Sequence, residues 1–287
     1  MYLQDLEYYV PDNIQEASSL LAELGPNAKL LAGGTDVLPS LKRERINPQA
    51  LISLKNLGTL KDIQYVEGRG VVIGALATLN ELMNSPILQE KYLSVSEAAH
   101  HMANNQIRNK GTIGGNIVNA VPSADLPPIL IALGATVTLE SNDGKRTMAL
   151  EDFFTGPSQS VIKPDEILTE VVIPDKSFTG SAYQKFGLRR SGALAVVGVA
   201  VAVRMDGDTC IDAGIALGAV APTPIRVEKA EQLLQGKIIT EEIILKAAEM
   251  AAETSKPISD IRASKEYRQD MVRVFTMRML KKAIDEG

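Results

Sequence analysis

The chain has 287 residues, of which 45% are hydrophobic and 23% charged, and its formal net charge is -5 at pH 7. This length suffices for two or three domains, and the composition is that of a globular protein rather than a disordered or fibrous one. The longest apolar run, residues 193–203, is well short of the roughly 20 residues of a membrane-spanning helix, so we expect no membrane span. The acidic balance argues against a nucleic-acid partner, which needs a basic face.

Residues that build redox centres are scarce in this chain. It has one cysteine, Cys210, and two histidines, His100 and His101. A disulfide framework, a cysteine-based zinc site and an iron–sulfur cluster held by this chain alone are therefore excluded. Any redox chemistry must use a bound cofactor. The first residues show neither the basic nor the apolar region of a secretory signal, so the cytoplasm is the expected compartment.

In the first part of the chain, helical and strand patterns alternate. Asn13 and Glu16 predict the start of a helix that Gly25 ends, and Thr78 with Glu81 forms a capping box for another. The same pattern at Ser94 and Glu97 predicts a helix that continues through Met102, and Asp125 is expected to cap a short helix ending at Gly134. The predicted strands are 29–32, 51–54, 71–75, 136–139 and 167–173.

A polar linker at residues 175–180 is followed by a different pattern. We expect an antiparallel meander of three strands, covered by three helices. The strands are 183–188, 194–204 and 211–220, and the helices are 226–235, 240–254 and 265–285. We therefore predict a first domain at 1–175, with subdomains of about 1–57 and 58–175, and a second at 181–287.

Two glycine pairs carry the strongest chemical signal. Gly33 and Gly34 follow a predicted strand, and Gly114 and Gly115 lie in a second glycine-rich loop. Glycines let a ligand approach backbone N–H groups closely, and consecutive N–H groups form an anion-binding nest that suits a pyrophosphate. Each pair taken alone is equally compatible with a simple tight turn. Neither the Rossmann fingerprint nor the P-loop pattern occurs.

Three segments together resemble a known family. Residues 30–37 (LLAGGTDV), 106–116 (QIRNKGTIGGN) and 123–128 (SADLPP) are similar in sequence, order and separation to the FAD-binding subunit of the molybdenum hydroxylases. That family includes the flavin domain of xanthine dehydrogenase and the medium subunits of carbon monoxide and nicotinate dehydrogenases. The resemblance implies an α+β fold, with a vanillyl-alcohol-oxidase-like (PCMH-type) FAD-binding domain of two subdomains. A C-terminal domain with a small antiparallel sheet covered by helices would follow.

The resemblance also implies a set of FAD-binding residues, and no catalytic or metal-binding ones. The first segment supplies Leu30, Leu31, Ala32, Gly33, Gly34, Thr35, Asp36 and Val37. The second supplies Gly111, Thr112, Ile113, Gly114, Gly115 and Asn116. The family's single positions fall on Met102, Asp125, Leu168 and Lys185.

Each single position also has a structural interpretation. Asp125 is expected as a helix N-cap in either case, and Met102 and Leu168 are compatible with ordinary core positions. Lys185 is either a cation near the flavin, which would stabilise its reduced form, or a solvated residue of an edge strand. His100 and His101 are expected to end a helix, with no catalytic role.

The resemblance implies that this chain passes electrons out of a multi-subunit hydroxylase to an acceptor. A molybdopterin-binding large subunit would oxidise the substrate, a small subunit with [2Fe–2S] clusters would pass electrons on, and FAD in this chain would deliver them to NAD+ or another acceptor. A free-standing FAD-dependent oxidase or dehydrogenase, or a non-catalytic assembly module, stays open as an alternative.

Two departures from relatives bear on the substrate. The first loop reads Gly-Gly-Thr-Asp, where carbon monoxide dehydrogenase subunits have Gly-Gly-His-Ser, and this disfavours carbon monoxide. One cysteine cannot build the extra cluster of 4-hydroxybenzoyl-CoA reductase. The sequence therefore favours the xanthine or nicotinate dehydrogenase branch, or a related azaheterocycle or aldehyde hydroxylase.

Overall fold

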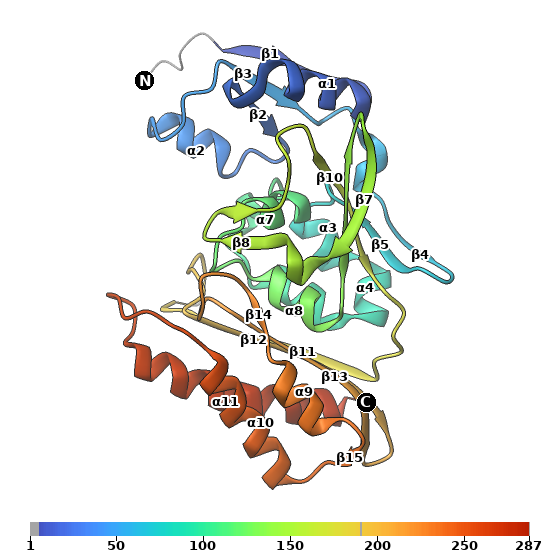
Figure 1. Ribbon diagram of the computed structural model, residues 1–287, viewed down its shortest axis with the longest axis vertical. Helices are drawn as coiled ribbons and strands as arrows, with labels where there is room; N and C mark the ends of the chain where they lie inside the picture. The colour runs from blue at the N-terminus through green and yellow to red at the C-terminus, as the bar shows by residue number, and fades with distance from the viewer. Residues whose placement is uncertain (1–5, 190, 287) are drawn as a thin grey trace.

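The computed structural model describes residues 6–189 and 191–286. Three sheets follow one another along the long axis of the molecule (Figure 1). The first is small and parallel, in the order β1-β3-β2. Its elements are β1 (Glu7–Tyr9), α1 (Ile14–Leu24), β2 (Ala28–Leu31), α2 (Val37–Lys42) and β3 (Ala50–Ser53).

The second sheet is antiparallel, in the order β4-β5-β10-β6-β7. Its strands are β4 (Ile63–Val66), β5 (Gly70–Gly74), β6 (Thr136–Ser141), β7 (Gly144–Ala149) and β10 (Ile167–Ile173). The helices around it are α3 (Leu79–Asn84), α4 (Pro86–Lys91), α5 (Leu93–His100), α6 (Asn105–Arg108), α7 (Ile113–Val118) and α8 (Leu126–Ala132). A small hairpin, β8 (Phe154–Gly156) and β9 (Gln159–Ser160), completes this part.

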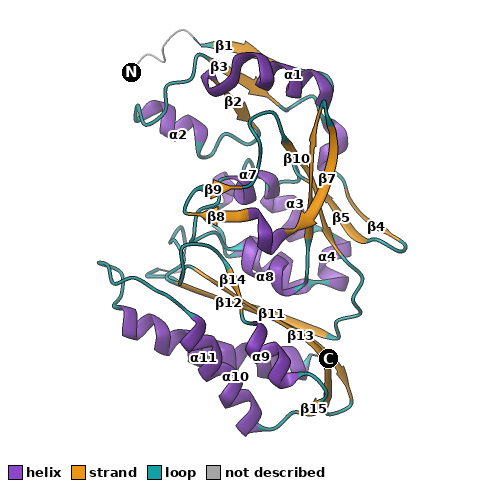
Figure 2. Cartoon of the chain, viewed as in Figure 1, coloured by secondary structure: helices purple, strands orange, loops and turns teal. Residues whose placement is uncertain are grey.

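The third sheet is the expected antiparallel meander, with the three C-terminal helices on one of its faces (Figure 2). Its strands are β11 (Gly180–Phe186), β12 (Val197–Asp206), β13 (Thr209–Gly218), β14 (Ile225–Arg226) and β15 (Lys237–Ile238). The helices are α9 (Glu228–Leu234), α10 (Glu241–Thr254) and α11 (Lys265–Asp285). The predicted α+β class is confirmed by this mixture of sheets and helices.

The two faces of the third sheet differ in side-chain size. Successive side chains of a strand point to opposite faces, and β12 alternates valine with glycine or alanine from Val197 to Val203. The valines pack in one core with α9, α10 and α11, whereas Ala200 and Ala202 belong to the core that contains residues of β5, α7 and α8. The small residues let α8 lie directly on the sheet: a Cβ atom at Gly214 would be 2.0 Å from the carbonyl oxygen of Ala132.

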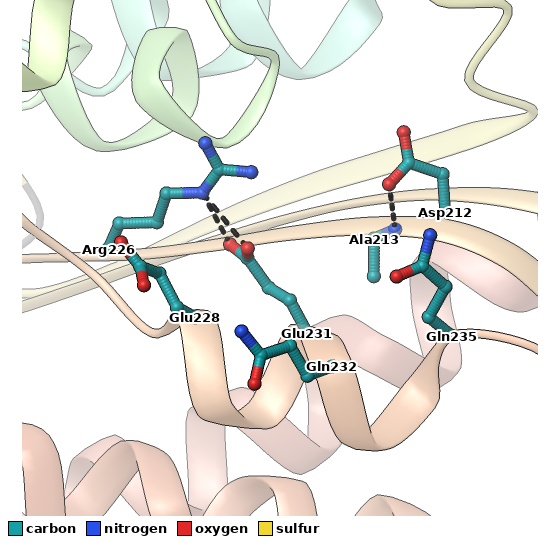
Figure 3. A pocket seen from close by; sticks show the side chains of 7 residues that line it. All are labelled: Asp212, Ala213, Arg226, Glu228, Glu231, Gln232 and Gln235. Atoms are coloured by element: carbon teal, nitrogen blue, oxygen red, sulfur yellow. Dashed lines mark hydrogen bonds and ion pairs between the residues drawn. The ribbon is translucent and has the colours of Figure 1, made fainter.

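Arg226 and two glutamates also link the third sheet to the part before it. Arg226 Nε donates to both carboxylate oxygens of Glu231, each at 2.9 Å (Figure 3). Arg226 Nη1 also lies 3.4 Å from Glu151 Oε1. Glu231 Oε1 also accepts the N–H of Ile215 at 2.8 Å. Arg226 and Glu231 border a polar pocket of about 270 Å³.

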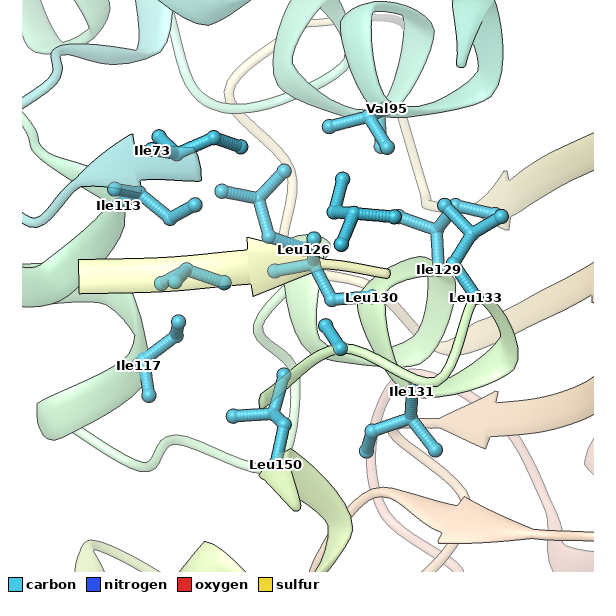
Figure 4. Close-up of a cluster of buried hydrophobic side chains, with 14 of the residues drawn as sticks. Ile73, Val95, Ile113, Ile117, Leu126, Ile129, Leu130, Ile131, Leu133 and Leu150 are labelled. Carbon is cyan, nitrogen blue, oxygen red and sulfur yellow. The ribbon is translucent and has the colours of Figure 1, made fainter. Parts of the chain in front are cut away.

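The main core lies between the second sheet and its helices. Fully buried side chains from α5, α7 and α8 meet those of β5 (Figure 4). Among them are Ile73, Val95, Ile113, Ile117, Leu126, Ile129 and Leu130. Because α7 and α8 are anchored in this core, the residues just before each helix are held in fixed positions.

The local signals near the start of the chain are confirmed. Asn13 accepts the N–H of Glu16, and Thr78 and Glu81 form both bonds of a capping box. The prediction for Ser94 is wrong: helix α5 starts after Tyr92, and the Ser94 hydroxyl lies 2.7 Å from that of Ser181 in β11. The short elements α2, α4 and β4 were not predicted.

Candidate functional site

A cavity of about 840 Å³ lies where the three sheets and their helices come together. Its volume is within the range of about 300–1,000 Å³ found for ligand sites. The first sheet contributes the segment after β2, the second contributes the start of α7, and the third contributes Lys185 and the loop before β12. The site is therefore assembled from residues more than 150 positions apart in the sequence.

The segment between β2 and α2 presents unbonded backbone donors. The N–H groups of residues 33–36 have no hydrogen-bond acceptor among the described residues. Gly34 has φ of +73°, a conformation that glycine adopts without strain, and it turns the chain from the strand into α2. Consecutive N–H groups in such a turn form an anion-binding nest. This part of the sequence prediction fits the geometry.

The second glycine segment is a helix rather than a loop. Thr112 is the N-cap of α7, and its hydroxyl accepts the N–H of Gly115 at 3.1 Å. The N–H groups of Ile113 and Gly114 donate to the carbonyls of Ala77 and Ala75, at 3.0 and 2.9 Å. The expectation of a second N–H nest is therefore wrong, because these donors are used inside the protein.

The second segment instead lies directly against the first, and both segments line the cavity. A Cβ at Gly33 would lie 1.8 Å from the carbonyl oxygen of Lys110, so the two segments touch through backbone atoms. Gly115 is exposed, and a Cβ there would meet only the Thr112 hydroxyl, at 3.0 Å. The adjacent Asn116 has a buried Oδ1 atom with no partner in the described chain. An open backbone and an orphaned polar atom at the cavity both fit a polar ligand.

A buried charge cluster lies at the third part of the cavity. Lys185 Nζ is 2.7 Å from Asp125 Oδ2, and the two side chains are only 9% and 7% exposed. Tyr183 donates its hydroxyl to Asp125 Oδ1 at 2.8 Å. Lys185 also donates to the carbonyl of His101 at 3.4 Å. The interpretation of Lys185 as a solvated edge residue is therefore wrong, since its ammonium group is enclosed.

The same cluster revises the role of Asp125. It does occupy the N-cap position of α8, but its side chain makes no capping bond there. Burial raises the pKa of Asp125, and the charge and hydrogen bond of Lys185, with that of Tyr183, act in the opposite direction. Burial also raises the pKa of Tyr183 well above its ordinary value, so Tyr183 is a neutral donor. Both oxygens of Asp125 are thus used to hold residues of β11.

The cavity brings together nearly all of the predicted site residues. Of the eighteen, all except Leu31 and Ile113 line it. Ile113 is fully buried in the main core, on the opposite side of α7. Met102 follows α5 instead of lying within it, and Leu168 is a buried residue of β10.

Other cavity residues were not predicted from the sequence. They include Leu76, Leu79, Ile107, Asn119, Lys163 and Leu194. Asn119 has a specific contact: burial raises the pKa of Asp36, and a hydrogen bond with Asn119 partly offsets this. Leu194 had a weak signal, because it lies at the start of the apolar run 193–203, just after Ala193, yet its side chain is 61% exposed at the cavity.

An ion pair fixes one edge of the cavity and gives a pH-dependent prediction. Arg146 donates to both oxygens of Glu166, at 2.7 and 2.8 Å, and thereby lowers the pKa of this cavity residue. Because the folded pKa lies below the unfolded value of about 4.3, the pair stabilises the fold above that pH and loses this effect at lower pH. We expect Glu166→Gln to cost about 1 kcal/mol at neutral pH, since Arg146 is 38% exposed.

Denaturant unfolding of FAD-free protein at pH 7 and at pH 3 to 4 would measure this effect. The difference between wild type and Glu166→Gln should shrink in acid. A difference that is equal at both pH values would contradict the assigned pairing.

Comparisons with known proteins agree with this geometry. Residues 4–176 match the family model described as the FAD binding domain in molybdopterin dehydrogenase. Residues 181–283 match the CO dehydrogenase flavoprotein C-terminal domain. The chain belongs to the FAD-binding subunits of the molybdenum hydroxylases. The predicted PCMH-type fold, the family and the oxidoreductase class are thereby confirmed, with FAD as the cofactor of this family.

Individual relatives match the chain over nearly its whole length. It is 38% identical to the carbon monoxide dehydrogenase medium chain of Hydrogenophaga pseudoflava, covering 96% of each chain. It is 33% identical to a putative xanthine dehydrogenase FAD-binding subunit of Escherichia coli, covering 96% of this chain and 95% of the relative. A solved carbon monoxide dehydrogenase from H. pseudoflava, lacking the Mo-pyranopterin moiety of its cofactor, superposes with a TM-score of 0.95 at 37% identity. That match covers 100% of this chain and 99% of the solved one.

These relatives are named for different substrates, but their sequence identities to this chain are similar. Sequence identity therefore does not indicate which substrate the complex oxidises. The preference for an azaheterocycle or aldehyde over carbon monoxide stays a prediction. Within residues 6–189 and 191–286, no helix has both the length and the apolar character needed to cross a bilayer.

Proposed function

We propose that this flavin-binding subunit collects electrons from an iron–sulfur small subunit and passes them to NAD+ or another acceptor. The observation that carries the proposal is one cavity that joins an open N–H nest at residues 33–36 to the enclosed cation Lys185. A flavin dinucleotide needs such a combination: an anion site for its central pyrophosphate, and charged groups near its redox-active ring that adjust its reduction potential.

The residues of the cavity would divide the work of binding. The N–H groups of residues 33–36 would hold the pyrophosphate, and Gly115 would let it approach the start of α7. The unpartnered Oδ1 of Asn116 would accept a hydrogen bond from a ligand hydroxyl or amide. Buried Met102 and Leu168 would exclude water. The other predicted residues along the cavity would complete the FAD site.

The cation has a separate role in the proposal. When bound, FAD accepts electrons singly and releases them in pairs, which no side chain of this protein can do. Lys185 would place a positive charge beside the negative charge that the flavin gains on reduction. No acid–base catalyst is required of this chain.

The remaining machinery would be on other chains. The relatives include medium chains of dehydrogenases, and a solved relative belongs to an enzyme with a molybdenum cofactor, whose Mo-pyranopterin moiety that structure lacks. With one cysteine in 287 residues, this chain lacks the ligands for a [2Fe–2S] cluster. We therefore place the [2Fe–2S] clusters, and with them the molybdopterin, on partner subunits. We also propose the division into domains 1–175 and 181–287, with subdomains of about 1–57 and 58–175, and a cytoplasmic location.

Purification of the complex through a tag on this chain would test the proposal. We expect the small and large subunits to copurify, and a substrate of the large subunit to bleach the flavin absorbance in the complex but not in the isolated chain. Turnover by the isolated chain would favour a free-standing dehydrogenase instead. A complex that assembles without flavin would identify an assembly module.

A further inference from the structure

We propose that Tyr183 is a positioning residue, which holds Asp125 so that the ammonium group of Lys185 acts on the redox end of the bound flavin. This inference rests on the proposed FAD site but adds a residue that does not line the cavity. Tyr183 would act through Asp125 and Lys185 rather than by touching the cofactor.

The geometry begins with the alternation of strand β11. Tyr183 and Lys185 are two residues apart on this strand, so their side chains lie on the same face of the sheet. That face meets the start of α8, where Asp125 lies. Tyr183 donates to one carboxylate oxygen at 2.8 Å and Lys185 to the other at 2.7 Å. Asp125 is therefore held from both sides by a single strand.

Burial makes this arrangement sensitive to the loss of one donor. Tyr183 is 4% exposed and Asp125 is 5% exposed, so water does not readily replace the phenol hydroxyl. The neighbouring strand leaves room for that hydroxyl: a Cβ at Gly198 would lie 3.3 Å from it. A buried carboxylate oxygen without a donor is costly, and its negative charge is then less dispersed.

The consequence is electrostatic. With the hydroxyl present, Asp125 shares its charge between a neutral phenol and a cation. Without it, Asp125 compensates more of the charge of Lys185 and adds a stronger negative potential at the cavity. Both effects disfavour the negative charge of a reduced flavin, so the flavin should become harder to reduce.

The test is the two-electron midpoint potential of FAD in the purified complex of the Tyr183→Phe variant. We expect a fall of about tenfold in the equilibrium constant for reduction, which is about 30 mV for a two-electron couple. Tyr92→Phe is the matched control, because Tyr92 is also buried in the same core, with 6% exposure. Its hydroxyl donates to the carbonyl of Pro174 at 3.2 Å, away from the cavity. The control should keep the wild-type potential and flavin content.

A second variant separates positioning from general disturbance. In a Lys185→Met background, stabilised by bound FAD, Tyr183→Phe should shift the potential by less than it does in the wild-type background, since the positive charge it positions is gone and only the effect on Asp125 itself remains. If that background does not fold, the comparison of Tyr183→Phe with Tyr92→Phe decides alone. A wild-type potential in Tyr183→Phe would overturn the inference, as would loss of flavin from that variant alone. Wild-type protein without flavin would instead overturn the proposed function.

Discussion

Replacing Lys185 with methionine is expected to lower the free energy of unfolding of the FAD-free chain by about 3–5 kcal/mol. The substitution keeps a long apolar stem but leaves the carboxylate of Asp125 enclosed without its cation. A single donor, Tyr183, then remains for a charge that is 5% exposed. Denaturant unfolding at neutral pH measures the loss, and the FAD-free form is used because ligand binding would mask it.

Two further variants sharpen this experiment. Adding Asp125→Asn to Lys185→Met should recover much of the stability, because the isolated buried charge is then removed. Lys246→Met is the matched control: Lys246 pairs with Glu242 at 2.7 Å on an exposed helix face, and no measurable change is expected. If Lys185→Met unfolds at the same denaturant concentration as wild type, Lys185 and Asp125 do not form the enclosed pair.

Gly115→Val is expected to reduce FAD affinity by about 100-fold or more, which is about 2.7 kcal/mol, with little effect on the fold. The valine side chain would fill space at an exposed position on the cavity wall, where the Thr112 hydroxyl lies 3.0 Å from the added Cβ atom. Valine is tolerated in a helix at least as well as glycine, so α7 should persist.

Other glycines serve as controls for this prediction. Gly58→Val makes the same change where a Cβ meets nothing within 4 Å and the residue does not line the FAD cavity, so FAD binding should be unaffected. Gly34→Val should weaken both binding and stability, because Gly34 has a positive φ that valine adopts only with strain of about 1–3 kcal/mol. Full flavin affinity in Gly115→Val would show that the ligand does not approach α7.

Signals that depend on neighbouring residues were predicted well from the sequence. The caps at Asn13 and Thr78 are formed within one helical turn, and the meander of the third sheet follows from strand alternation and tight turns. Ser94 has the same local pattern as Thr78, but its hydroxyl bonds to Ser181, 87 residues away. Sequence patterns close to a residue carry no information about such a partner.

The difference between partners near in sequence and partners far apart also explains which features of the cavity could be predicted. Both glycine pairs were identified, but only the first is an open nest, because carbonyls of Ala75 and Ala77 use the donors of the second. The pairing of Asp125 with Tyr183 and Lys185 joins positions about 60 residues apart, and the capping pattern at Asp125 gave no sign of it. Leu31 and Ile113 lie in the matched segments yet do not line the cavity, since a motif does not specify the direction of each side chain.

The most direct test of the central claim is a titration of the FAD-free wild-type chain with FAD, in parallel with Gly115→Val. The account predicts saturable binding of one FAD per chain in wild type, with a perturbed flavin spectrum, and strongly weakened binding in the variant. Absence of binding to a folded wild-type chain, or equal binding by both proteins, would contradict it.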